Sequence, residues 1–150
     1  MDIKSLLKSL NAHDVRYMVI GAFAFPYYGY TRATVDIDIF IEPSSENAAR
    51  THQALVAFGY DLADLQPEDL LKNKILIRQH VLETDIHPFV AGAVFSEVWE
   101  HRQAGKIEGE DVYFPSLDDL IKMKRAANRE KDQQDLKILL KLKQQSRDSA

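Results

Sequence analysis

The N-terminal part of the chain alternates between apolar runs and helix-breaking residues, which predicts a succession of short elements. Leucines at helical spacing predict a helix over about 2–12. Residues 15–20 then form a β-branched and aromatic run that indicates a buried strand ending at Gly21. A short helix is expected next, closed by Gly29, with Pro26 either limiting its length or lying in its first turn.

The clearest strand covers 35–41, where apolar and acidic positions alternate with a period of two. One face carries Val35, Ile37, Ile39 and Ile41, and the other carries Asp36, Asp38 and Phe40. A helix is expected over 46–58. The stretch 62–72 is ambiguous and favours a loop with a short helix after Pro67.

The second half of the chain gives weaker patterns, which still predict a definite order of elements. Strands over 74–78 and 81–87 are expected to pair as a hairpin, followed by a helix over 95–102 and a strand over 111–114. The next helix runs to about 127, with Ser116 as its N-cap and Asp119 at the capping-box position. A break at 128–131 separates it from a final helix that runs from Asp132 to about 145. We expect residues 146–150 to be frayed. Together these patterns predict an α/β (α+β) fold with a mixed, twisted central sheet of about four or five strands, flanking helices and a C-terminal helical pair that closes a cleft.

Composition narrows the class of protein. A chain of 150 residues fits a single domain, 1–150, with a core that needs no cross-links. It has no cysteine, which excludes disulfides and thiolate zinc sites. We find no signal-peptide pattern and no apolar stretch of about 20 residues, so we expect a cytoplasmic protein that does not interact with membranes.

Charge is uneven along the chain. The net charge of −4 argues against a surface that coats nucleic acid. Basic residues nevertheless outnumber acidic ones from Lys122 to Lys143. A polyanionic ligand is therefore still expected to be attracted to one face.

Carboxylates on two predicted strands form the main candidate site. Asp36 and Asp38 share one strand face about 7 Å apart, which is unfavourable for like charges unless a cation lies between them. Oxygen ligands on a rigid strand suit Mg²⁺, although a solvated strand face explains an isolated Asp-x-Asp equally well. Asp85 lies on the same face of its strand as His87, and the three aspartates converge if the two strands pair. His87 is then either a ligand or base, or, as lone histidines more often are, a structural residue.

Residues 20–42, IGAFAFPYYGYTRATVDIDIFIE, resemble the signature of minimal nucleotidyltransferases of the DNA polymerase β-like superfamily: a Gly-Gly or Gly-Ser after a strand, a helix, then Asp-x-Asp on the next strand. The form from Arg32 to Asp38 looks most like the small bacterial branch related to AbiEii-type toxins. Residues 117–139, LDDLIKMKRAANREKDQQDLKIL, are similar to the closing segment of that branch. The resemblance covers about 15–142.

This resemblance implies a nucleotidyltransferase-like fold and site. It makes Asp36, Asp38 and Asp85 the catalytic metal triad for two Mg²⁺ ions, with Mn²⁺ as a substitute. It implies nucleotide-binding roles for Gly21, Ala22, Arg32, Thr34, Lys124, Arg129 and Lys131. Ala22 departs from the family pattern, because it replaces the second Gly or Ser and lacks a hydroxyl, although its backbone N–H remains.

Several of these residues also have structural interpretations. Lys124 could be an ordinary solvated helix lysine, and Arg129 with Lys131 either pins a turn or approaches the triphosphate. Asp132 and Asp135 are more typical of a helix cap than of a metal ligand. The aromatic residues between 23 and 30 are best interpreted as core and pocket wall, with stacking of one ring on a nucleobase as the alternative.

The function implied is transfer of a nucleoside monophosphate from a nucleoside triphosphate to an acceptor hydroxyl, with pyrophosphate leaving. The acceptor is a tRNA end, a protein side chain or a small molecule, and the resembling branch adds a toxin–antitoxin partner protein. A catalytically weak nucleotide-binding subunit, such as an antitoxin or regulatory module, is the alternative. A metal-dependent phosphohydrolase is a third possibility.

Overall fold

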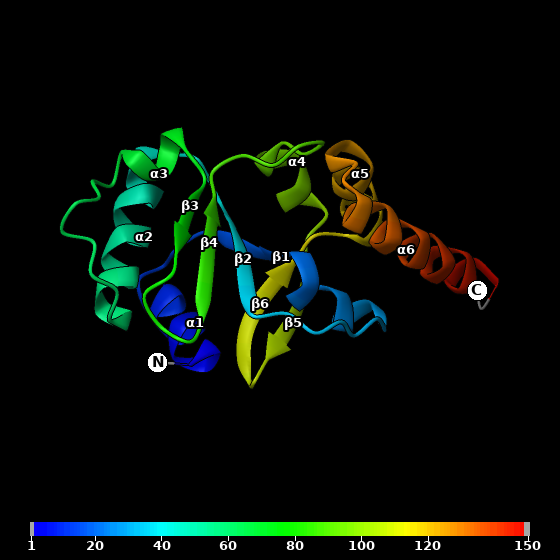
Figure 1. Ribbon diagram of the computed structural model, residues 1–150, viewed down its shortest axis with the longest axis horizontal. Helices are drawn as coiled ribbons and strands as arrows, with labels where there is room; N and C mark the ends of the chain where they lie inside the picture. Colours follow the sequence, from blue (N-terminus) through cyan, green and yellow to red (C-terminus); the bar gives the residue numbers. More distant parts are fainter. Residues whose placement is uncertain (1, 149–150) are drawn as a thin grey trace.

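The computed structural model describes residues 2–148 and is organised around a four-stranded mixed sheet in the order β1-β2-β4-β3 (Figure 1). These strands are β1 (Tyr17–Ile20), β2 (Asp36–Ile41), β3 (Ile75–Ile77) and β4 (Glu83–His87). The predicted α+β class with a mixed central sheet is confirmed.

Strand pairing fixes which residues face each other at the centre of this sheet. β2 and β4 run parallel, with Asp38 opposite Asp85, while β1 and β3 pair antiparallel on the two outer sides. The expected hairpin of β3 and β4 is therefore confirmed. Ile37 and Ile39 of β2 are fully buried, whereas the two aspartates between and before them are partly exposed, as the alternation predicted.

Three helices lie together on one side of Figure 1: α1 (Ile3–Ala12), α2 (Ser45–Phe58) and the short α3 (Asp69–Lys72). Asp2 caps α1 by accepting a hydrogen bond from the Ser5 amide, and Ser44 caps α2 in the same way. The leucines of α1 are fully buried, so the amphipathic pattern of the N-terminus is a core face.

A second sheet was not expected. β5 (Gln103–Ile107) and β6 (Glu110–Phe114) form an antiparallel hairpin, of which only β6 was predicted. Both turn residues, Glu108 and Gly109, have positive φ. This conformation is typically encoded by Asn-Gly or Asp-Gly, so the Glu-Gly pair gave little signal.

The segment after β1 is also different from the expected helix. It forms two separate 3-10 turns, η1 (Gly21–Phe23) and η2 (Phe25–Tyr28), with Pro26 in the first turn of η2 and Gly29 as its left-handed C-cap. Because η1 has only three residues, it supplies backbone N–H groups near the sheet but not the dipole of a regular helix.

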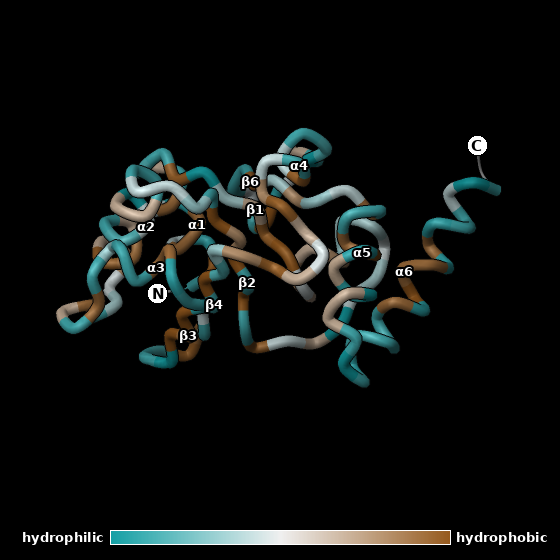
Figure 2. The backbone as a smooth tube through the Cα atoms, turned by 90° about the horizontal axis from the view of Figure 1, so that it is seen from above, coloured by the Kyte–Doolittle hydropathy of each residue, from teal (hydrophilic) through white to brown (hydrophobic). Residues whose placement is uncertain are grey.

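The C-terminal helices form the other side of the molecule. α4 (Phe95–Glu100) precedes the β5–β6 hairpin, and α5 (Leu117–Ala127) begins at the predicted N-cap, Ser116. Asn128, in the left-handed conformation, ends α5, and α6 (Glu130–Asp148) extends away from the sheet with alternating hydrophobic and hydrophilic turns (Figure 2). The predicted fraying is wrong for residues 146–148, which are helical, and its last two positions, 149–150, lie outside the described residues.

The core is continuous from α1 and α2 through the main sheet to α5 and α6. Its largest fully buried side chains include Phe25, Phe40 and Phe114, which come from three different elements or turns. Within residues 2–148, the helices are all too short or too polar to cross a lipid bilayer.

Candidate active site

Four carboxylates form two rows on one face of the central sheet. The pairing of β2 with β4 sets Asp36 opposite Glu83 and Asp38 opposite Asp85. Alternate residues of a strand project to the same side, so all four side chains project from one face. The sequence predicted three of these acids, and the structure adds Glu83.

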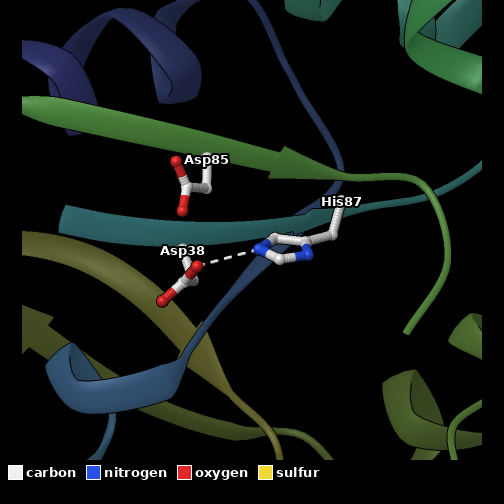
Figure 3. Close-up of side chains that lie close together, drawn as sticks. All are labelled: Asp38, Asp85 and His87. Carbon is white, nitrogen blue, oxygen red and sulfur yellow. Dashed lines mark hydrogen bonds and ion pairs between the residues drawn. The ribbon is translucent and has the colours of Figure 1, made fainter. Parts of the chain in front are cut away.

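Asp38, Asp85 and His87 form the tightest group in this region (Figure 3). One ligand atom from each lies within 4.8 Å of the others, and His87 Nε2 is 2.8 Å from Asp38 Oδ1. Opposite ligands of a small octahedral dication lie about 4.2 Å apart, given metal–ligand distances of about 2.1 Å, so side-chain movements of about 0.6 Å or less let these residues hold such an ion. Asp36, predicted as a third ligand, lies outside this group and beside Glu83.

Arg78 is a site residue that the sequence reasoning missed. Its Nη1 lies 2.7 Å from Asp85 Oδ1, and its Nε lies 3.4 Å from Glu83 Oε2. The hydrogen bond to Asp85 raises the pKa of Arg78, while a hydrogen bond with Asp36 raises the pKa of Glu83 above that of an ordinary carboxyl. Arg78 therefore offsets part of the repulsion among the acids. The only hint in the sequence was its position at the end of the predicted hairpin strand.

The backbone at Gly21 lies so close to the Asp38 side chain that a glycine is favoured at this position. Its φ is +69°, and a Cβ at this position would collide with Asp38 Oδ2. Any other side chain here is therefore strained by the positive φ and has to displace the Asp38 carboxylate. The turn after β1 thus packs the backbone at Gly21 against the Asp38 carboxylate.

Cations on the opposite wall are held by two buried aspartates. Lys124 Nζ lies 3.1 Å from Asp132 Oδ1 and 3.2 Å from Asp135 Oδ2. Arg129 Nε donates to Asp132 at 2.6 Å, and Arg32 Nη2 lies 3.2 Å from Asp135. Lys124 is thus not a solvated helix lysine.

The two aspartates differ from the capping pair that was expected. Asp132 does accept a hydrogen bond from the Arg129 amide at the start of α6. Burial would raise its pKa, but the hydrogen bonds from Arg129 and Lys124 lower the pKa of Asp132 to about 2. Asp135 instead joins Lys124 and Arg32 across the fold. The capping interpretation is therefore wrong for Asp135.

A cleft of about 190 Å³ lies between the carboxylates and these cations. It is lined by every residue to which the sequence assigned a site role: Gly21, Ala22, Arg32, Thr34, Asp36, Asp38, Asp85, Lys124, Arg129 and Lys131. His87 and Asp132 also line it, and so does Lys74, another residue that was missed. The structure therefore brings all the predicted positions to one cavity, while their individual roles stay predictions.

Comparison with known proteins supports the class that this fold and cleft indicate. A family model described as "Nucleotidyltransferase of unknown function (DUF6036)" matches residues 1–144. The chain belongs to this nucleotidyltransferase family, so the general resemblance found in the sequence is confirmed. The likeness to the AbiEii-type branch stays a prediction, because the description of the family names no branch. No curated protein matches the chain.

Proposed function

We propose that the protein transfers a nucleoside monophosphate from a magnesium-bound nucleoside triphosphate to an acceptor hydroxyl and releases pyrophosphate. The observation that carries this proposal is the single cleft, in which the two central strands supply carboxylates and the facing helices supply cations. Metal-bound triphosphate carries both kinds of charge and needs both kinds of partner.

The carboxylates have the first role in this proposal. Asp38 and Asp85 hold divalent cations, and Asp36 completes the set after a side-chain rotation from its place beside Glu83. When bound, two such ions neutralise charge on the attacking and leaving oxygens of an in-line displacement. One of the carboxylates accepts the proton of the acceptor hydroxyl. The new bond joins that oxygen to the α-phosphorus, and the bond to the bridging oxygen of pyrophosphate breaks.

Backbone amides and cations bind the triphosphate in this scheme. Gly21 and Ala22 line the cleft and offer their backbone N–H groups to the phosphates, and Ala22 lacks only the hydroxyl of the usual serine. Lys124 contributes a fixed charge because two buried aspartates and the ring of Phe25 hold its side chain in place. We assign nucleotide contacts also to Arg32, Thr34, Arg129 and Lys131, which line the same cleft.

The acceptor that we propose is a tRNA end, a protein side chain or a small molecule. The resemblance to the AbiEii-type branch supports a toxin–antitoxin setting with a partner protein.

A catalytically weak nucleotide-binding subunit, acting as an antitoxin or regulatory module, is the second candidate. Two observations favour it. Arg78 already neutralises Asp85, and the cations Lys124 and Arg129 are already paired with buried Asp132. A site of this kind can bind nucleotide without positioning it for transfer.

The experiment that separates these functions follows the label of each α-labelled nucleoside triphosphate in cell extract, with Mg²⁺ or Mn²⁺. We expect label on RNA, protein or a small molecule, with pyrophosphate released, only when Asp36 and Asp38 are intact. The matched control is the Asp36→Ala, Asp38→Ala double variant. Metal-dependent nucleotide binding without transfer would support the binding subunit, and release of phosphate without transfer would support a phosphohydrolase.

A further inference from the structure

We propose that His87 is a direct metal ligand and that its imidazole makes this site prefer Mn²⁺ or Co²⁺ over Mg²⁺. The inference rests on the proposed function only in requiring that the cleft bind a divalent cation. It changes the ligand set from three carboxylates to two carboxylates and a nitrogen.

The position of His87 follows from the strand that carries it. His87 lies two residues after Asp85 on β4, so both side chains project from the same face. In the parallel register, His87 is the partner of Phe40, which places the imidazole one row beyond Asp38 and Asp85. The close-up shows the ring reaching back along the sheet to Asp38 (Figure 3).

The distances fit shared coordination. His87 Nε2 and Asp38 Oδ1 are 2.8 Å apart, and the atoms offered by all three residues lie within 4.8 Å of one another. Adjacent ligands of an octahedral ion with bonds of about 2.1 Å are separated by about 3 Å. A cation can therefore replace the contact between His87 and Asp38 with little movement of the backbone.

Burial supports a ligand role over a surface contact. The side chain of His87 is 13% exposed, and it lines the cleft with both aspartates. Another histidine–aspartate pair, His101 with Asp119, offers a contrast because the His101 side chain is 62% exposed and Asp119 also accepts a hydrogen bond from Ser116. The first pair faces a cavity with a further carboxylate, whereas the second belongs to the start of α5.

Ligand chemistry then predicts which metals bind. Mg²⁺ favours oxygen ligands and keeps its waters, whereas imidazole suits first-row transition metals. One nitrogen among the ligands should therefore shift selectivity toward Mn²⁺ and Co²⁺ without excluding Mg²⁺.

Calorimetric titration of the full chain with MnCl₂ or MgCl₂, without nucleotide, tests this inference. We expect wild type to bind Mn²⁺ about tenfold or more tightly than Mg²⁺, and His87→Gln to lose most of that preference. Glutamine still donates a hydrogen bond to Asp38, so a histidine that merely positions Asp38 would tolerate this change. His101→Gln is the matched control and should behave as wild type.

Pulsed electron paramagnetic resonance of the Mn²⁺ complex gives a direct second measurement. A coordinated imidazole nitrogen should give modulation that His87→Gln removes and His101→Gln keeps. Equal Mn²⁺ affinity and an unchanged nitrogen signal in His87→Gln would overturn the inference. If Asp38→Asn still abolished cation binding, the proposed function would survive that result. If wild type bound no divalent cation even with nucleotide present, both would fail.

Discussion

The two walls of the cleft differ in how far their charged side chains are compensated by partners of opposite charge. On β2 and β4, four carboxylates lie side by side, with only Arg78 and His87 as close partners of opposite or mixed character among the contacts described. On the opposite wall, Lys124 and Arg129 are both paired with buried Asp132, and Lys124 also contacts buried Asp135. Like charges that lie close together without full compensation reduce the stability of the folded protein. In a buried ion pair, by contrast, removing one partner leaves the other charge uncompensated and destabilises the fold. The first wall therefore suits the cation-binding role that we propose for it, whereas the ion pairs of the second wall contribute to the stability of the fold.

The largest expected effect comes from Asp38→Asn, which removes one carboxylate from the wall formed by β2 and β4. Nucleotide transfer should fall by more than about a hundredfold, because even the loss of a ligand's neighbour costs about 10- to 100-fold in metal affinity or activity. The melting temperature should stay the same or rise, since one like charge is removed. Pyrophosphate release and thermal unfolding measure the two effects, and unchanged release would contradict the assignment of Asp38.

On the opposite wall, formed by α5 and α6, Asp132→Asn should lower the stability of the fold, whereas Asp38→Asn should not. This change leaves Lys124 and Arg129 without their shared partner and should cost about 3 kcal/mol of unfolding free energy. Denaturant unfolding measures it. Asp118→Asn is the control, because the Asp118–Lys143 pair is at the surface and should cost less than about 1 kcal/mol. Equal effects of the two substitutions would show that burial of the pair does not matter.

Gly21→Ala tests the close approach of backbone and carboxylate. We expect it to weaken transfer about tenfold or more, because the added Cβ displaces Asp38, together with a stability loss of about 1 kcal/mol from the positive φ. Gly109→Ala is a matched control, since Gly109 also has positive φ but no heavy atom within 4 Å of the new Cβ. Similar activity losses in both variants would contradict the collision argument.

The pH dependence of stability should also distinguish the walls. The pKa of Asp132 is lowered from 3.8 to about 2 in the folded protein. Its contribution to stability is therefore present above about pH 5 and lost as the pH falls toward 2. Thermal unfolding of wild type between pH 6 and pH 2 should show a steeper fall than that of Asp132→Asn, and parallel curves would contradict this.

The smallest effect is expected for Arg78→Gln. Removing this guanidinium takes a positive charge and a competitor away from Asp85, so divalent cations should bind severalfold more tightly. Calorimetry measures the change, with Arg50→Gln as the control because Arg50 pairs with Glu46 on the surface of α2. Weaker binding in Arg78→Gln would mean that Arg78 orients Asp85 for the metal.

Local patterns explain what could be predicted from the sequence. The alternation around Asp36 and Asp38, and the spacing of Asp85 and His87, follow from the two-residue period of a strand. Ser116 predicted the start of α5 for a similarly local reason. The position of the cleft residues in one cavity needed the resemblance as well, because no local pattern joins Gly21 to α5 and α6.

The remaining features depend on contacts between distant segments. Arg78 became a site residue only through pairing of β3 with β4, and Asp135 only through its contacts with Arg32 and Lys124. β5 was missed because Gln103-Ala-Gly-Lys-Ile has little alternation, and its turn, Glu108-Gly109, is not one of the favoured pairs.

A crystal structure with Mn²⁺ and a nucleoside triphosphate analogue that resists cleavage between the α- and β-phosphates would test the central claim most directly. We predict an anomalous peak within bonding distance of Asp38 and Asp85, with the phosphates between the Gly21 turn and Lys124. A nucleotide bound elsewhere, or a cleft that contains phosphates but no metal near these aspartates, would contradict the account.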